Sequence, residues 1–259
     1  MPLLSEKRLR DALRKCGRRG ASSGADGVSM AALRKLSQEL LPRLAEQLAT
    51  GTWRPEPVRE VTFSAYTGKV MTVAIPTARD RVVHRALRDA MEPVLETAVL
   101  RDWVSGYRPG RNRITALRQA AAFHDAGLRA VADVDVASTS EGATVDEVVG
   151  WCAEHIHDGS FLALIRTALS AMPYPIAPGS GLAPMLINLR LSRADAHLDG
   201  LRVVRFVDNY VAFEPDRDHA RSAFARITDA LARSGLRPNG SKSRVRERAN
   251  VEDLFLIGG

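Results

Sequence analysis

The stretch VVRFVDNYVAF, residues 203–213, has the pattern of a β-hairpin. The apolar runs Val203–Val204 and Tyr210–Phe213 form the two arms, and Val207-Asp208-Asn209 lies between them. Asp and Asn tolerate positive φ and are favoured in short hairpin loops, which is one explanation for a carboxylate at this tip. The other explanation is that the hairpin displays Asp208 as a metal ligand. The hairpin alone leaves both explanations open.

A second carboxylate, Asp135, lies at the end of the short apolar stretch AVADVDV, residues 130–136. A strand and a hairpin that each carry an Asp at the tip can together hold divalent cations, since Mg²⁺ prefers carboxylate and phosphate oxygens. Two such ions about 4 Å apart can activate a hydroxyl and stabilise a leaving group. Asp135 and Asp208 are therefore a candidate metal-binding pair.

The rest of the chain alternates helices and strands. Apolar periodicity predicts helices at 5–17, 30–49, 79–95, 113–126, 144–156, 160–171, 182–198 and 217–234. A hairpin is expected within 53–73, with its turn at Thr67-Gly68, and a short hairpin-like segment at 243–257. This order indicates an α+β fold in which helices cover one face of an antiparallel sheet.

Composition and charge indicate the chemical class of the partner and the cellular compartment. The chain has 259 residues and a net charge of +7, and the excess arginine is spread along it. A basic folded protein favours a polyanionic partner, RNA or DNA first. No apolar run approaches the ~18 residues of a membrane span. The charged N-terminal stretch is unlike a secretory signal, and two isolated cysteines, Cys16 and Cys152, suit a reducing compartment. We expect a cytoplasmic protein with no membrane partner.

Several motifs occur in an order typical of one family. They are SGADGVS (23–29), AIPTARDRVVHRALRDAMEPVLE (74–96), SGYRPGRN (105–112), GSGLAPMLINLRL (179–191), FVDN (206–209), GLRPNGSKSRV (235–245) and LFLIGG (254–259). Taken together, this chain resembles the bacterial reverse transcriptases, nearest to the group II intron type, from about residue 20 to its end. His84 lies where that family usually has Gln, which makes it a substituted structural position.

The resemblance implies a fold and a metal site. It implies N-terminal helices and fingers, with part of the palm helices, at 1–125. It implies a palm at 126–259, whose antiparallel sheet is backed by helices, and we expect no thumb. It places Asp135 and Asp208 on the two catalytic aspartates, with Asn209 as a third metal-binding position. The implied cofactor is Mg²⁺ or Mn²⁺. A protein partner that supplies a thumb is a further expectation.

The resemblance also implies positions that handle nucleotide and nucleic acid. The nucleotide-binding positions are Lys69, Thr139, Ser140 and Gly179. The nucleic-acid-binding positions are Arg108, Arg111 and Lys242.

The sequence departs from the family pattern where the nucleotide is handled. Asn209 stands at a carboxylate position, and Ala65 and Met71 stand where the fingers carry basic residues, although Lys69 is nearby. Pro178 replaces a Gln, and Thr139-Ser140 replace an aromatic pair.

These departures predict a reverse-transcriptase-like protein that binds nucleic acid, with template-directed nucleotidyl transfer weakened or lost. Two alternatives stay open. One is an active RNA-directed DNA polymerase with an unusual nucleotide pocket, and the other is a non-catalytic subunit that pairs with another polymerase.

Overall fold

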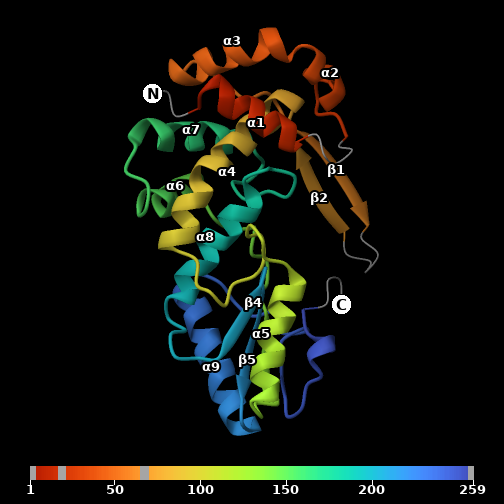
Figure 1. Cartoon of the computed structure of the whole chain (residues 1–259), viewed down its shortest axis with the longest axis vertical. Helices are drawn as coiled ribbons and strands as arrows, with labels where there is room; N and C mark the ends of the chain where they lie inside the picture. Colours follow the sequence, from red (N-terminus) through yellow and green to blue (C-terminus); the bar gives the residue numbers. More distant parts are fainter. Residues whose placement is uncertain (1–3, 17–21, 65–69, 256–259) are drawn as a thin grey trace. The chain divides into compact units, whose positions relative to one another are not determined.

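The computed structural model describes residues 4–16, 22–64 and 70–255, which form two compact units (Figure 1). Unit 1 comprises Met1–Ala98 and Ser140–Leu186, and unit 2 comprises Val99–Thr139 and Ile187–Gly259. Both units are discontinuous in sequence. They do not coincide with the ranges 1–125 and 126–259, so a functional boundary at residue 125 stays a prediction.

Unit 1 is mainly helical. It contains α1 (Glu6–Cys16), α2 (Met30–Lys35), α3 (Ser37–Ala49), β1 (Arg59–Ser64), β2 (Val70–Ile75), α4 (Ala78–Ala98), α6 (Val145–Ala153), α7 (Gly159–Ser170) and the start of α8 (Ala183–Asp195). The single helix expected over 30–49 is wrong, because Leu36 leaves helical geometry at φ −91° and ψ 1° and separates α2 from α3. Ser29 caps α2 by accepting from Ala32 N.

The buried carboxylate of Asp80, within the motif at 74–96, holds the start of α4 in place. It accepts hydrogen bonds from Trp53 Nε1 (3.3 Å), Glu56 N (2.8 Å) and Thr77 Oγ1 (2.9 Å). Asp80 also lies in the first turn of α4, where a carboxylate interacts favourably with the helix dipole. Asp80 therefore fixes the start of α4 to the segment that precedes β1.

The loop Ala177–Gly179 docks against strand β2 of the β1–β2 hairpin. Ala74 N donates to Pro178 O over 2.8 Å. Gly179 has φ +101°, and a Cβ added there would lie 2.2 Å from Ala74 O. Only glycine fits this close approach of backbone to backbone. The predicted turn at Thr67-Gly68 lies outside the described residues.

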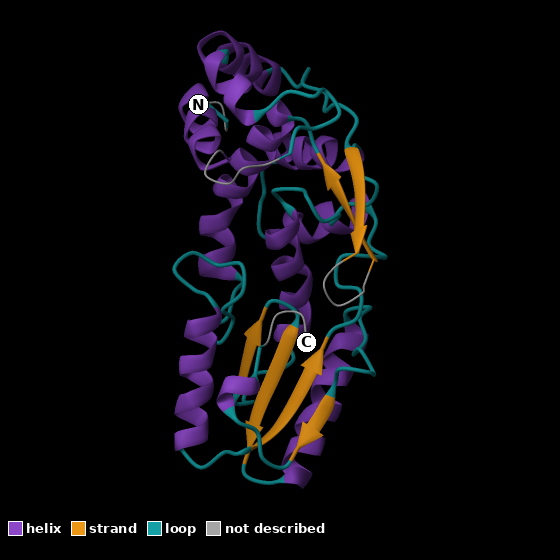
Figure 2. Ribbon diagram, turned by 90° about the vertical axis from the view of Figure 1, so that its right-hand side faces the viewer, coloured by secondary structure: helices purple, strands orange, loops and turns teal. Residues whose placement is uncertain are grey.

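Unit 2 is built on a four-stranded antiparallel sheet, whose strands lie side by side in Figure 2. The strands are β3 (Ala130–Asp135), β4 (Val203–Phe206), β5 (Asn209–Glu214) and β6 (Arg244–Arg246), in the order β4-β5-β3-β6. The helices of unit 2 are α5 (Arg113–Asp125), the second half of α8, α9 (Arg217–Arg233) and the 3₁₀ turn η1 (Val251–Asp253). The predicted α+β class agrees with this mixture of helices and antiparallel sheets.

Helices cover both faces of the unit 2 sheet, so the expectation of one covered face is wrong. Ala132 and Val134 of β3 pack in one core cluster with Ile227 of α9. Val131, on the opposite face, packs in a second cluster with Ala120 of α5. Because side chains alternate along a strand, β3 contributes to both clusters and is buried on both sides.

The terminal hairpin-like segment expected over 243–257 is also wrong for its described part, residues 243–255. Strand β6 pairs with β3 instead, with Val245 opposite Ala132. The segment after it contributes Ala249, Leu254 and Phe255 to the core cluster on the α5 face. Within the described ranges, no helix has both the length and the apolar character needed to cross a membrane.

Candidate functional site

Asp135 ends β3 and is held by the turn that precedes β6. Asn239 Nδ2 donates to Asp135 Oδ1 over 3.1 Å, and Asn239 N donates to Asp135 O over 2.7 Å. The Ser243 hydroxyl accepts from Asp135 N and donates to Asp135 O, both over 3.1 Å. These contacts fix the backbone of Asp135 and one oxygen of its carboxylate.

Asp208 lies in the two-residue loop between β4 and β5, where Phe206 pairs with Asn209. The sequence assigned positive φ to Asp or Asn, but in this loop Val207 adopts it, at φ 59°. Positive φ at the first loop position is the pattern of a type II′ turn, in which glycine is usual, and a β-branched residue there is strained. Val136 N donates to Asp208 O over 3.0 Å, which ties the loop to the end of β3.

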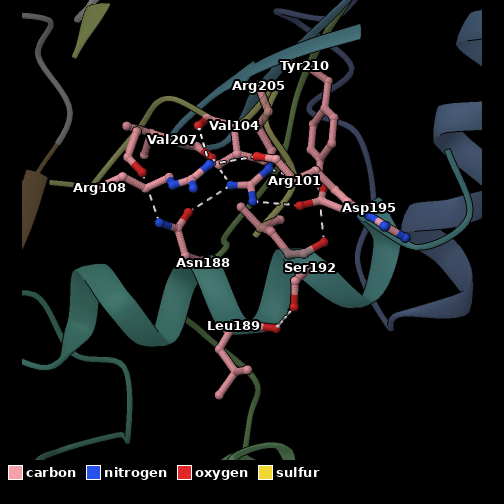
Figure 3. A network of polar contacts seen from close by, with 12 residues as sticks. Arg101, Val104, Arg108, Asn188, Leu189, Ser192, Asp195, Arg205, Val207 and Tyr210 are labelled. Carbon is pink, nitrogen blue, oxygen red and sulfur yellow. Dashed lines mark hydrogen bonds and ion pairs between the residues drawn. The ribbon is translucent and has the colours of Figure 1, made fainter. Parts of the chain in front are cut away.

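A buried polar network under the loop stabilises this strained turn (Figure 3). Arg205 is fully buried, and its Nη1 donates to Val207 O (2.8 Å) and to Asn188 Oδ1 (2.9 Å). Its other nitrogens bind both oxygens of Asp195, at 3.2 and 2.7 Å. The Tyr210 hydroxyl donates to Asp195 Oδ1 over 2.7 Å. Arg205 thus connects helix α8 to the carbonyl of the residue that precedes Asp208.

Tyr210 stays a hydrogen-bond donor in this network, because burial, and then the charge of Asp195, raise its pKa well above the ordinary value. A network in which each buried charge has partners holds one geometry, whereas a half-satisfied network is costly. The network therefore acts as a rigid support for the β4–β5 loop.

The loop 105–107 packs against the same turn. Ser105 N donates to Arg205 O, and Asn188 Nδ2 donates to Gly106 O. A Cβ at Gly106 would lie 2.2 Å from Val207 N, so this position needs glycine. The motif SGYRPGRN therefore has a packing role beside the β4–β5 loop.

Asp135 and Asp208 line one cavity of about 490 Å³ within unit 2. Its other lining residues are Tyr107, Arg111, Asn112, Phe206, Val207, Asn209, Lys242 and Phe255. Burial, and then the charge of Asp135, raise the pKa of the Asp208 carboxyl, while Lys242 acts in the opposite direction. A carboxyl whose charged form is disfavoured by a neighbouring carboxylate in the same cavity suits a hard cation.

The third predicted metal position, Asn209, is directly opposite Asp135 in the sheet. Asn209 Nδ2 donates to Asp133 Oδ1 over 3.0 Å, and Arg246 Nη2 binds Asp133 Oδ2 over 2.6 Å. Among the described residues, no donor reaches the buried Asn209 Oδ1. A buried amide oxygen without a donor fits a cation ligand, so the donor set at this position is compatible with Mg²⁺ or Mn²⁺.

Carboxylates alone do not complete a metal site in the described part of the chain. No group of three or more His, Cys, Asp and Glu side chains is placed there to hold an ion. The candidate site has two carboxylates and one amide. Binding of Mg²⁺ or Mn²⁺ by Asp135, Asp208 and Asn209 stays a prediction.

The three predicted nucleic-acid-binding residues differ in their surroundings. Arg108 is only 9% exposed, and its Nη1 donates to the carbonyls of Arg101 (2.6 Å) and Val104 (2.9 Å). Arg108 therefore supports the loop that contains these two residues. Arg111 lines the cavity and forms an ion pair with Asp102. Lys242 is exposed and also lines the cavity. Contacts with nucleic acid stay predictions for all three.

The predicted nucleotide-binding residues are divided between the units. Thr139 is buried in unit 2, and its carbonyl accepts from Arg190 Nη1. Ser140 and Gly179 belong to unit 1. Lys69 and Ala65 lie outside the described residues, while Met71 lies in β2 opposite Phe63. The roles assigned to these residues stay predictions.

Sequence reasoning gave no role to the residues that support the aspartates. These are Asp133, Asp195, Arg205, Asn239 and Arg246. The sequence could have indicated Asp133, because a residue two positions before Asp135 lies on the same face of the strand. No local sequence pattern indicates the partners of Arg205, which are distant in sequence.

Comparison with known proteins supports the resemblance at a distance. No protein-family model matches this chain. It is 27% identical to protein YkfC of Escherichia coli (strain K12) over 189 residues, which cover 68% of this chain and 49% of that protein. It is 25% identical over 206 residues to the group II intron-encoded protein LtrA of Lactococcus lactis subsp. cremoris, covering 75% of this chain and 34% of LtrA.

A third relative is an uncharacterized 91 kDa protein in the cob intron of Schizosaccharomyces pombe, 24% identical over 186 residues, which cover 68% of this chain and 23% of that protein. This chain spans half or less of the length of these relatives. The matches support a distant relationship to intron-encoded, reverse-transcriptase-like proteins.

Proposed function

We propose that this chain is a reverse-transcriptase-like protein that binds RNA or DNA through fingers and palm, with weakened template-directed nucleotidyl transfer. The observation that carries the proposal is that Asp135 and Asp208, 73 positions apart in the sequence numbering, line one cavity at the end of an antiparallel sheet. The distant similarity to a group II intron-encoded protein supports the same assignment.

In this proposal Asp135, Asp208 and Asn209 hold Mg²⁺ or Mn²⁺. The cation would lower the pKa of an attacking hydroxyl and stabilise negative charge on phosphate oxygens. The residues of this chain fix where that happens. Asn239 orients the Asp135 carboxylate, and Arg205 holds the turn before Asp208.

The basic residues of the cavity have a separate role in this proposal. Arg111 and Lys242 line the same cavity as the two aspartates, so both lie where a nucleic-acid phosphate would approach them. Neutralising phosphates releases counterions, which makes the affinity depend strongly on salt. Binding of nucleic acid is therefore separable from the chemistry at the aspartates.

The weakening has two sources in this proposal. An amide at position 209 brings an oxygen but no charge to the cation. Ala65 and Met71 bring no charge to a triphosphate. Losing one preorganised donor to developing charge costs about 2.7–4 kcal/mol in other enzymes, so two such losses slow the chemical step by orders of magnitude.

Primer extension on an RNA template tests the proposal, with Asp135→Asn, Asp208→Asn and wild type compared in Mg²⁺ and in Mn²⁺. Asp125→Asn is the matched control, because Asp125 is an exposed carboxylate at the end of α5. We expect wild type and all variants to bind primer–template. We expect wild-type extension far below the ~1–10³ s⁻¹ of ordinary enzymes, and none in the two site variants.

Two results would contradict the proposal. Wild-type extension at ordinary polymerase rates would establish the active-polymerase alternative. If wild-type protein does not bind primer–template at low salt, the result would support the other alternative, a non-catalytic subunit that pairs with another polymerase.

A further inference from the structure

The side chain of Asn209 is anchored by a residue that is not its direct partner in the sheet. Asn209 lies opposite Asp135, and Asp133 lies opposite Val211. Asp133 and Asn209 are therefore diagonal neighbours on one face of the β3–β5 pair, within reach of polar side chains. The hydrogen bond from Asn209 Nδ2 to Asp133 Oδ1, at 3.0 Å, joins these two diagonal neighbours.

Asp133 accepts the hydrogen bond from Asn209 with Oδ1. Asp133 is 7% exposed. Its second oxygen, Oδ2, accepts a hydrogen bond over 2.6 Å from Nη2 of Arg246, a residue of strand β6. The Asp133 carboxylate thus accepts a hydrogen bond at each of its two oxygens. It therefore selects the orientation of the Asn209 carboxamide in which nitrogen faces Asp133 and oxygen faces away from it.

That orientation leaves Asn209 Oδ1 without a donor among the described residues, in a residue that lines the cavity of Asp135 and Asp208. We propose that Asp133 is a positioning residue that turns the Asn209 carboxamide so that its oxygen serves a divalent cation in this cavity. The cation part rests on the proposed function. The pairing of Asp133 with Asn209 does not.

The proposal changes what a carboxylate at position 209 would do. Asn209→Asp alone would put two carboxylates within hydrogen-bond distance of each other, replacing a donor–acceptor pair by repulsion. Adding Asp133→Asn exchanges the acid and the amide. The amide at position 133 would then donate to the carboxylate at 209 and still accept from Arg246. The exchanged pair keeps the total charge of the site and moves the carboxylate into the cavity lining.

Asp133→Asn alone has a different consequence. With Arg246 donating to its oxygen, the amide introduced at position 133 would present its nitrogen to Asn209. The Asn209 carboxamide would then rotate and accept with Oδ1, the oxygen that no donor of the described residues reaches in wild type. A mere packing role for Asn209 predicts no effect of this rotation on cation binding.

The experiment compares four full-length proteins, namely wild type, Asp133→Asn, Asn209→Asp and the double variant. Thermal unfolding without divalent cations measures the pairing, and Mn²⁺ titration followed by EPR of the free ion measures the site. Asp208→Asn shows whether the measured Mn²⁺ is in this cavity. Asp125→Asn is the control for a carboxylate outside it.

For unfolding, we expect Asn209→Asp to lower the Tm by about 4 °C or more, and the double variant to recover most of that loss. If the two substitutions simply add, Asp133 and Asn209 are not a pair and the proposal is overturned.

For Mn²⁺, we expect Asp133→Asn to weaken binding about 10-fold, the scale seen when a partner of a metal ligand is removed. We expect the double variant to bind more tightly than wild type. Unchanged affinity in both overturns the cation role of position 209. If Asp208→Asn also leaves Mn²⁺ affinity unchanged, the proposed metal site fails, while the unfolding result still decides the pairing.

Discussion

Replacing Arg205 with methionine tests whether the buried network supports the β4–β5 loop. The methionine keeps an unbranched side chain of similar length but removes two bonds to Asp195 and one each to Asn188 and Val207. Asp195, at 1% exposure, would keep the Tyr210 hydroxyl as its side-chain donor in this network. We therefore expect a large loss of stability.

The size of that loss follows from the burial of both charges. Removing one partner of a buried ion pair costs about 3–5 kcal/mol, because the remaining charge stays uncompensated. A surface pair would cost about 0–1 kcal/mol. Urea unfolding at neutral pH measures the difference, with Arg221→Met as the control, since Arg221 forms an exposed pair with Asp218.

A second variant separates stability from positioning. Replacing a buried ion pair by apolar residues of similar volume is often neutral, so Arg205→Met combined with Asp195→Leu should recover most of the free energy of unfolding. It cannot restore the bond to the Val207 carbonyl. We expect Mn²⁺ affinity to stay reduced about 10-fold in the double variant. Arg205→Met within 1 kcal/mol of wild type, or full recovery of Mn²⁺ affinity in the double variant, would refute this reasoning.

Three other predictions concern the scaffold and the nucleic acid. Burial lowers the pKa of His84 to about 4, although Asp80 opposes it, so the unfolded chain binds the extra proton between pH 6.5 and 4. Stability should therefore fall by about 2 kcal/mol from pH 7 to pH 5 in urea unfolding, and His84→Gln should flatten that dependence. Gly179→Ala should cost about 3 kcal/mol because of the contact with Ala74 O, whereas Gly110→Ala, with positive φ but open space around it, should cost about 1–2 kcal/mol; equal losses would count against the contact. Binding of duplex DNA should weaken with salt at a slope of about −0.9 per phosphate neutralised, and Lys242→Gln should reduce the slope by about one; an unchanged slope would remove Lys242 from the interface.

The sequence predicted the main secondary structure of unit 2 because its signals are local. The hairpin at 203–213 and the strand ending in Asp135 follow from apolar runs and turn residues that lie next to each other. The order of the motifs, through the family resemblance, then predicted that Asp135 and Asp208 act as a pair. The structure places both in the lining of one cavity.

The sequence did not predict the features that depend on distant partners. Positive φ falls on Val207 rather than on Asp208 or Asn209, because the turn is held by Arg205, whose side chain is anchored on α8, and by the loop at Gly106. Strand β6 joins β3 across about 110 residues, which no local pattern indicates. The same separation hid the contact of Arg246 with Asp133.

Divalent-cation binding tests most directly whether Asp135 and Asp208 form one site. Mn²⁺ titration of the full chain, followed by EPR, should show binding that weakens at least about 10-fold in Asp135→Asn and in Asp208→Asn, and stays unchanged in Asp125→Asn. Wild-type protein that binds no Mn²⁺ at millimolar concentration, or site variants that bind it as tightly as wild type, would contradict the account.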